Sequence, residues 1–121
     1  MAGKIVADTL EHSTSGSLST QYVVEGSAKA WANYAHSTGI NENLNVSTFT
    51  DNGTGDYSLS LVNSFSNANY AVGATARSGG DRTVVLDSSS TASVVRTNLY
   101  VTSSGATTDG DATMSAHGDL A

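Results

Sequence analysis

The stretch from Thr50 to Leu61, TDNGTGDYSLSL, decides the fold because it joins a turn signal to a strand signal. Its second half alternates serines with apolar residues: Tyr57, Leu59 and Leu61. This period of two is typical of a strand with one buried face. Three turn residues tolerate a positive φ: Asn52, Gly53 and Gly55. Aspartates beside them can cap backbone N–H groups, so the stretch and the preceding run 44–50, LNVSTFT, predict a β-hairpin.

The same cluster of Asp, Asn and Gly also raises the question of a calcium or phosphate site. An EF-hand needs oxygen ligands at alternate positions and a Glu at position twelve. Counted from Asp51, positions three and five are Gly53 and Gly55, and no Glu follows at twelve. A phosphate loop needs a helix after its glycines, whereas DYSLSL alternates like a strand. The pattern therefore favours a turn.

Alternation of period two continues outside the hairpin. It recurs in the runs 28–34, 70–76, 83–86, 95–101 and 112–116. With the hairpin this gives about seven or eight short strands, a number compatible with a sandwich or a small barrel. We expect an all-β fold, an antiparallel and jelly-roll-like β-sandwich.

The chain of 121 residues has room for one domain with an arm. The segment EHSTSGSLST before Tyr22 has the composition of a linker. We therefore expect residues 1–20 to form an extended N-terminal arm for attachment or assembly, and residues 21–121 to form the sandwich. The chain contains no Pro to protect edge strands, which favours edges paired within an oligomer.

Composition excludes several classes of function. The formal net charge is −6, which opposes binding to nucleic acid or to anionic membranes. Cysteine is absent, so the chain has no disulfide, thiolate zinc site or thiol nucleophile. No apolar run has the length of a signal peptide or of a membrane span. We expect a soluble protein that is made in a cytoplasm without Sec targeting, with no nucleic-acid partner and no membrane insertion.

No motif points to catalysis. The histidines are widely separated: His12, His36 and His117. No G-x-S-x-G elbow occurs, and eleven acidic residues supply carboxylate pairs without indicating a glycosidase. We expect no enzymatic activity, no catalytic, cofactor-binding or metal-ligating residues, and no cofactor. A serine triad assembled from distant positions, and a metal held by three copies of His117 on a trimer axis, remain open alternatives.

Aromatic residues leave a binding function open. The candidates are Trp31, Tyr34, Tyr57, Tyr70 and Tyr100. Their alternation with apolar neighbours favours packing in a core or between subunits. The alternative is a host-glycan-binding (receptor-binding) module, which needs an exposed Trp or Tyr surrounded by carboxylates or amides.

Three segments together resemble a known family. They are YVVEGSAKAWANY (22–34), TDNGTGDY (50–57) and NANYAV (67–72), in that order along roughly half of the chain. This combination resembles a small all-β domain of tailed-bacteriophage tail-fibre and other virion structural proteins. The tail SSGATTDGDATMSAHGD is similar to the last hairpin of that family only loosely, and AHSTGINEN is shorter or more divergent than the expected connection.

The resemblance implies a non-enzymatic virion structural protein, tail-fibre-like or capsid-decorating. It implies a surface-exposed homotrimer, assembled in the host cytoplasm and located on the virion surface, whose arm binds capsid or tail proteins. Three residues are then candidates for a subunit interface or for packing: Trp31, Phe49 and Tyr70. Four others are candidates for receptor-facing loops: His36, Asn41, Asp81 and Arg82.

Overall fold

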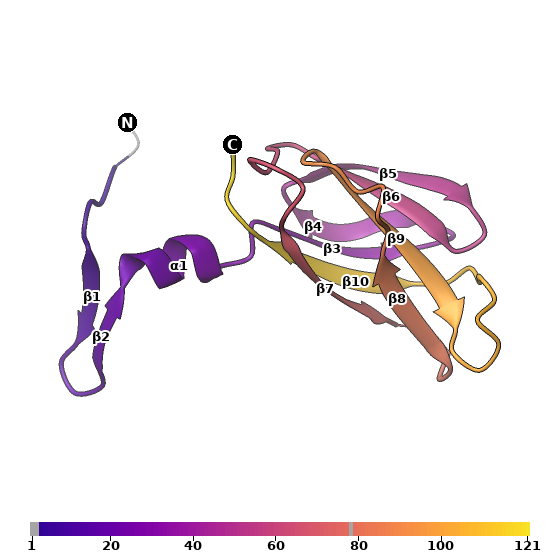
Figure 1. Ribbon diagram of the computed structural model, residues 1–121, viewed down its shortest axis with the longest axis horizontal. Helices are drawn as coiled ribbons and strands as arrows, with labels where there is room; N and C mark the ends of the chain where they lie inside the picture. Colours follow the sequence, from indigo (N-terminus) through magenta and orange to yellow (C-terminus); the bar gives the residue numbers. More distant parts are fainter. Residues whose placement is uncertain (1–2, 78) are drawn as a thin grey trace.

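Two antiparallel sheets packed face to face form the main body of the molecule, and a separate arm projects from one end (Figure 1). The computed structural model describes residues 3–77 and 79–121. The first sheet has the order β4 (Gly39–Leu44), β3 (Ala30–Ala35), β10 (Ala112–His117) and β7 (Ala71–Ala76). The second has the order β5 (Val46–Gly53), β6 (Asp56–Leu61), β9 (Val94–Val101) and β8 (Arg82–Leu86). The predicted all-β, antiparallel sandwich is confirmed, and its jelly-roll-like detail stays a prediction.

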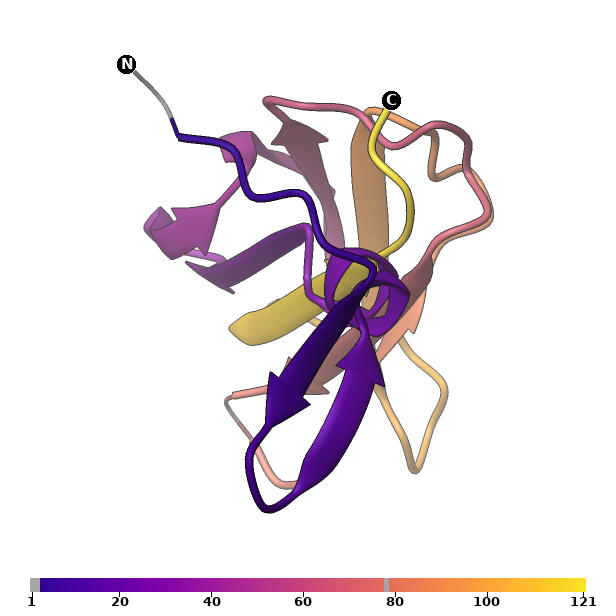
Figure 2. The same ribbon diagram turned by 90° about the vertical axis from the view of Figure 1, so that its left-hand side faces the viewer.

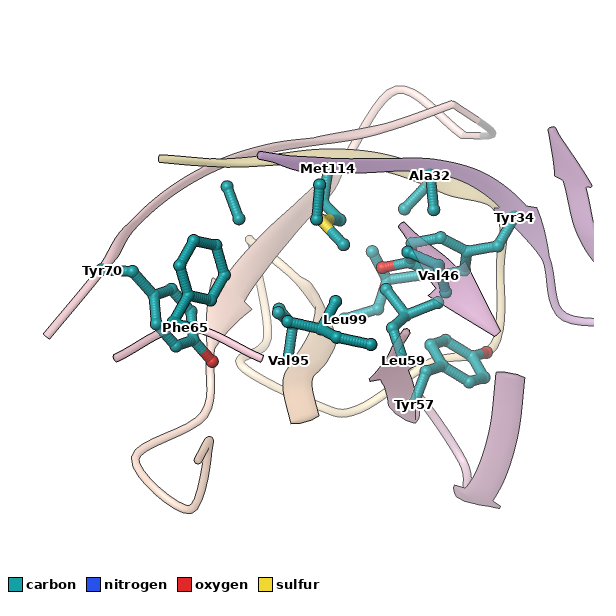
Figure 3. Packing of buried hydrophobic residues seen from close by; sticks show 14 residues of the cluster. Ala32, Tyr34, Val46, Tyr57, Leu59, Phe65, Tyr70, Val95, Leu99 and Met114 are labelled. Carbon is teal, nitrogen blue, oxygen red and sulfur yellow. The ribbon is translucent and has the colours of Figure 1, made fainter. Parts of the chain in front are cut away.

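The core lies between the sheets, where the alternating residues of each strand meet (Figure 3). The first sheet contributes mainly small side chains: Ala30, Ala32, Ala112 and Ala116. The second contributes larger ones: Tyr57, Leu59, Val95 and Leu99. Small side chains facing large ones allow two sheets to interdigitate at native density.

Aromatic side chains close the core at both ends. At one end Phe65 and Tyr70 stack, with ring centroids 4.4 Å apart. At the other end the ring of Phe49 lies 5.4 Å from that of Tyr57 and 5.7 Å from that of Tyr34. The Tyr34 hydroxyl also hydrogen-bonds the buried Thr97 hydroxyl at 2.8 Å, which joins the two sheets through polar groups. Burial raises the pKa of Tyr34, so this hydroxyl stays protonated at neutral pH.

The predicted hairpin is present as β5 and β6. Gly53 and Gly55 have positive φ values of 142° and 68°, and Asp51 Oδ1 accepts a hydrogen bond from the Gly53 N–H at 3.0 Å. The positive φ expected at Asn52 is wrong. Asn45 adopts one instead, at 61°, where the chain passes from β4 into β5. Its side-chain oxygen there accepts a hydrogen bond from the backbone N–H of Asn63 at 2.7 Å.

Strand β4 was not predicted. Most of its side chains are exposed because it is the edge of its sheet, so its sequence GINENL carries no buried alternation. It still pairs with β3 through a register that shifts between Asn33 and Tyr34. The segment that sequence patterning interpreted as a connection is therefore a strand.

The arm contains regular structure. Strands β1 (Thr9–His12) and β2 (Gly16–Ser19) pair with each other, and helix α1 (Thr20–Gly26) follows. The Ser19 side chain caps the helix by accepting from the Gln21 N–H at 3.3 Å. Residues 21–26, which the sequence assigned to the sandwich, thus belong to a helix outside it, and the first sandwich strand begins at Ala30 (Figures 1 and 2). Residues 1 and 2 of the predicted arm lie outside the described residues.

The sandwich has two unlike ends. The connections β3–β4, β5–β6, β7–β8 and β9–β10 lie at the end away from the arm, which we call the distal end. The connections β4–β5, β6–β7 and β8–β9 lie at the arm end, where the C-terminus also emerges (Figure 1). This polarity places the candidate loops relative to the arm.

Candidate functional site

The distal end brings together residues from three connections that are far apart in sequence. His36 follows β3, and its Nδ1 lies 3.4 Å from Asp51 Oδ2 and 3.6 Å from Asp109 Oδ1. Asp51 belongs to the β5–β6 hairpin, and Asp109 to the connection before β10. His36 and both carboxylates are partly exposed, so this cluster is open to solvent.

Beneath the cluster, hydrogen bonds fix the distal connections to one another. Asp109 Oδ1 accepts from the Gly55 N–H at 2.8 Å and from the Tyr57 hydroxyl at 3.2 Å. The Tyr57 oxygen accepts in turn from the Gly110 N–H at 3.1 Å. Burial, together with the Asp109 carboxylate, raises the pKa of Tyr57 to about 12, so its hydroxyl donates throughout the neutral range.

Gly55 is the least replaceable residue of this end. A Cβ on it would lie 2.6 Å from the carbonyl oxygen of Leu99 and 2.7 Å from that of Thr108, and both of these atoms belong to the backbone. Its φ of 68° adds a second requirement for glycine. The TDNGTGDY motif therefore serves backbone geometry, as the turn interpretation expects.

The other predicted receptor-facing residues also lie toward the distal end. Asp81, in the β7–β8 turn, accepts hydrogen bonds from the hydroxyls of Thr102 and Ser103 and so ties this turn to the next loop. Arg82 begins β8 in the same turn. Asn41 lies on β4 rather than in a loop, and its Nδ2 donates to Asn33 Oδ1 at 3.3 Å. His36, Asp81 and Asn41 are thus held by protein partners, and His36 contacts the carboxylates of Asp51 and Asp109.

The three predicted packing residues lie in different environments. Tyr70 is buried at the arm end, and its hydroxyl donates to the carbonyls of Thr91 and Val94 at 3.0 and 3.1 Å. Phe49 is half-buried against the aromatic group at the distal end. Trp31 alternates with the buried Ala30 and Ala32, so it lies on the outer face of the first sheet.

The outer face of the second sheet carries a polar network that the sequence did not predict. The Arg96 guanidinium binds both carboxylate oxygens of Asp56, with its Nε 2.7 Å from Oδ1. Asp87 accepts from the Ser89 backbone N–H at 2.7 Å and hydroxyl at 2.6 Å, and from the Asn98 amide. The bonds to Ser89 lower the pKa of Asp87 to about 2, and the bond to Arg96 lowers the pKa of Asp56.

The outer face of the first sheet is hollowed. A shallow hollow of about 620 Å³ lies on it, bordered by Trp31 and by residues of three neighbouring strands. The outward side chains that line it are Trp31, Asn33, Thr75, Thr113 and Ser115, and Gly73 leaves its floor open.

Among the described residues, no group of three or more His, Asp or Glu side chains is arranged to hold a metal ion. The nearest partners of the His36 ring are carboxylates. His117 Nδ1 instead lies 3.1 Å from the Gly26 carbonyl oxygen at the arm end. No helix within residues 3–77 and 79–121 has the length and apolar character that crossing a bilayer requires.

Comparisons with protein-family models, with curated proteins and with solved structures found no match to this chain.

Proposed function

We propose that this protein is a non-enzymatic bacteriophage virion structural protein, tail-fibre-like or capsid-decorating, that is exposed on the particle surface as a homotrimer. The three segments that resemble virion β domains support the proposal, because they contribute β3, the β5–β6 hairpin and the start of β7 to the sandwich. The conformation of the hairpin depends on Gly55, so this motif marks a fold rather than a catalytic function.

The single observation that carries the proposal is the arm. Every described residue from Gly3 to Ser27 is exposed except the half-buried Thr20. Apolar side chains are nevertheless concentrated there: Ile5 is 92% exposed, Val6 81%, Tyr22 70% and Val24 63%. Such a patch on an ordered segment marks an interaction surface.

The arm also lacks the means to stabilise itself. Helix α1 has seven residues, whereas isolated helices shorter than about 12–15 residues are marginal in water. A lone two-stranded hairpin such as β1–β2 is marginal as well. Burial between subunits would stabilise both elements, and a symmetric oligomer supplies that burial with identical surfaces.

The two ends of the sandwich then have different tasks. The arm end attaches the protein to other copies and to capsid or tail proteins. The distal end, with His36, Asp81 and Arg82, faces away from the particle and is available to host receptors.

Electron cryo-microscopy of intact particles tests this proposal, with analytical ultracentrifugation of the purified full chain beside it. We expect trimers at the particle surface. The variant Tyr22→Ser should weaken the trimer because it removes an exposed aromatic of α1, whereas the neighbouring polar change Gln21→Ser should leave it intact. A monomeric mass together with absence from purified virions would overturn the proposal.

A further inference from the structure

The outer face of the first sheet presents an aromatic side chain beside a row of hydroxyls. Strand pairing places Trp31 opposite Ser115, and Ser115 opposite Gly73. The adjacent row places Asn33 opposite Thr113, and Thr113 opposite Thr75. The two rows border the hollow of about 620 Å³, which lies within the usual range for ligand sites of roughly 300–1,000 Å³.

Polar groups on this face lack protein partners. Within residues 3–77 and 79–121, no hydrogen bond engages the Trp31 indole N–H or the hydroxyls of Thr75, Thr113 and Ser115. The second sheet differs, since its outward Asp56, Arg96 and Asn98 all bind one another or Asp87. The donors and acceptors of the first face are therefore free to serve a ligand.

The Asn33 amide is also oriented so that it can bind a ligand. Its Oδ1 accepts from Arg77 Nη1 at 2.7 Å and from Asn41 Nδ2 at 3.3 Å. With the oxygen occupied, the amide nitrogen is left as a fixed donor at the edge of the hollow. Asn41, predicted as receptor-facing, then acts by positioning Asn33.

The chemistry of the face selects the class of ligand. Its described lining residues carry no formal charge, which disfavours a phosphate-rich or strongly anionic ligand. An apolar protein surface would leave the hydroxyls and the indole N–H unpaired, at a cost in free energy. A sugar ring offers a C–H face that can pack on the indole and hydroxyls that can form hydrogen bonds. It therefore matches both the aromatic side chain and the polar groups of this face.

We propose that this face binds a neutral polysaccharide chain, with one pyranose ring on Trp31 and its hydroxyls on Asn33, Thr113 and Ser115. Gly73 makes the site possible because it has no side chain in the floor of the hollow. The proposal concerns the isolated protein, so it stands or fails independently of the location on a virion.

The first experiment uses the fluorescence of Trp31, the single tryptophan of the chain. We expect saturable quenching or a blue shift when the protein is titrated with members of a panel of neutral polysaccharides: dextran, laminarin, mannan and galactan. Heparin, the charged control, should give no saturable response. No saturable binding to any neutral member would overturn the proposal, and so would equal binding to heparin.

Variants measured by affinity electrophoresis and calorimetry locate the site. Trp31→Ala should weaken binding at least about tenfold, as is usual for an aromatic anchor. Tyr100→Ala is the matched control, because Tyr100 is a half-buried outward aromatic on the second sheet and its loss should leave binding unchanged. Equal losses in both variants would contradict the assignment.

Gly73→Val blocks the hollow and leaves the fold intact. Its Cβ would meet only the Ser115 hydroxyl oxygen, at an ordinary 3.7 Å, and its φ is not positive. We expect an unchanged melting temperature and loss of binding. Thr113→Val removes one hydroxyl at constant shape and should weaken binding about three- to tenfold. Full binding by Gly73→Val, or a face covered by a second copy of the chain in the assembled oligomer, would overturn the proposal.

Discussion

The outer faces of the two sheets both carry polar residues, yet they use them differently. On the second sheet, Arg96 pairs with Asp56, and Asp87 receives bonds from Ser89 and Asn98. On the first sheet, the hydroxyls of Thr113 and Ser115 engage no other described residue. The second face uses its polar groups to hold its own strands and loops, whereas the first leaves them for another molecule.

This difference teaches that the presence of polar residues alone does not distinguish a supporting surface from a binding surface. Both faces rest on the same core, so a change in the core should abolish both, whereas a change on one face should leave the other intact.

Leu59→Ala should have the largest effect. Leu59 is fully buried between the sheets, and the loss of such a side chain costs about 2–5 kcal/mol in the free energy of unfolding. Urea unfolding monitored by circular dichroism measures the loss. Leu44→Ala is the matched control, because Leu44 is 50% exposed on edge strand β4 and its change should cost far less. Equal costs would show that the core does not lie where the structure places it.

Tyr34→Phe should have the next largest effect. It leaves the buried Thr97 hydroxyl without its partner, which costs about 1–3 kcal/mol. Adding Thr97→Val should recover part of the loss, because the double variant has no unpaired hydroxyl. A double-mutant cycle by denaturant unfolding measures the coupling between the two sheets. Strict additivity would argue against this hydrogen bond.

Asp56→Asn on the second sheet and Thr113→Val on the first sheet compare the contributions of the two outer faces to stability. Asp56→Asn weakens the ion pair with Arg96 and should cost about 1 kcal/mol or less, because the pair is partly exposed. Thr113→Val on the opposite face should change stability by less than about 0.5 kcal/mol. Thermal unfolding at low salt and in about 1 M NaCl measures both, and salt should reduce only the Asp56 effect. A larger cost at Thr113 would show that the first face is not free.

Asp87→Asn should have the smallest effect of these variants. Its effect should be a change in how stability depends on pH in acid. The pKa of Asp87 is lowered from 3.8 to about 2 in the folded protein, so its stabilising contribution is complete above about pH 4. The contribution is lost as pH falls from about 4 to 2, because protonation then removes the acceptor of the Ser89 bonds. Stability measured across this range should fall less steeply in the variant than in the parent protein. Identical slopes would contradict the assigned bonds.

Sequence patterning predicted those parts of the fold in which burial follows a local period. Strands β6 and β10 alternate buried and outward residues throughout, β9 does so from Val94 to Tyr100, and all three were predicted. Strand β4 was missed because an edge strand with exposed side chains needs no alternation. Helix α1 was missed because no buried face imposes a helical period on its seven residues.

Side-chain clusters were beyond prediction because they join distant parts of the chain. Asp56 and Arg96 are 40 positions apart, and His36 meets Asp109 from the opposite half of the sequence. Their meeting depends on the strand order β5-β6-β9-β8 and on the packing of the sheets, neither of which leaves a local signal. The candidate residues were identified singly, and only the fold shows which of them meet.

Successive connections alternate between the two ends of the sandwich, so the position of a fused peptide determines the end at which it lies. A peptide inserted among the exposed residues 103–105 would project from the end opposite the arm. A tag at the C-terminus would instead sit at the end from which the arm projects (Figure 1). The choice of fusion point therefore decides whether a passenger sequence lies beside the arm or at the opposite end of the sandwich.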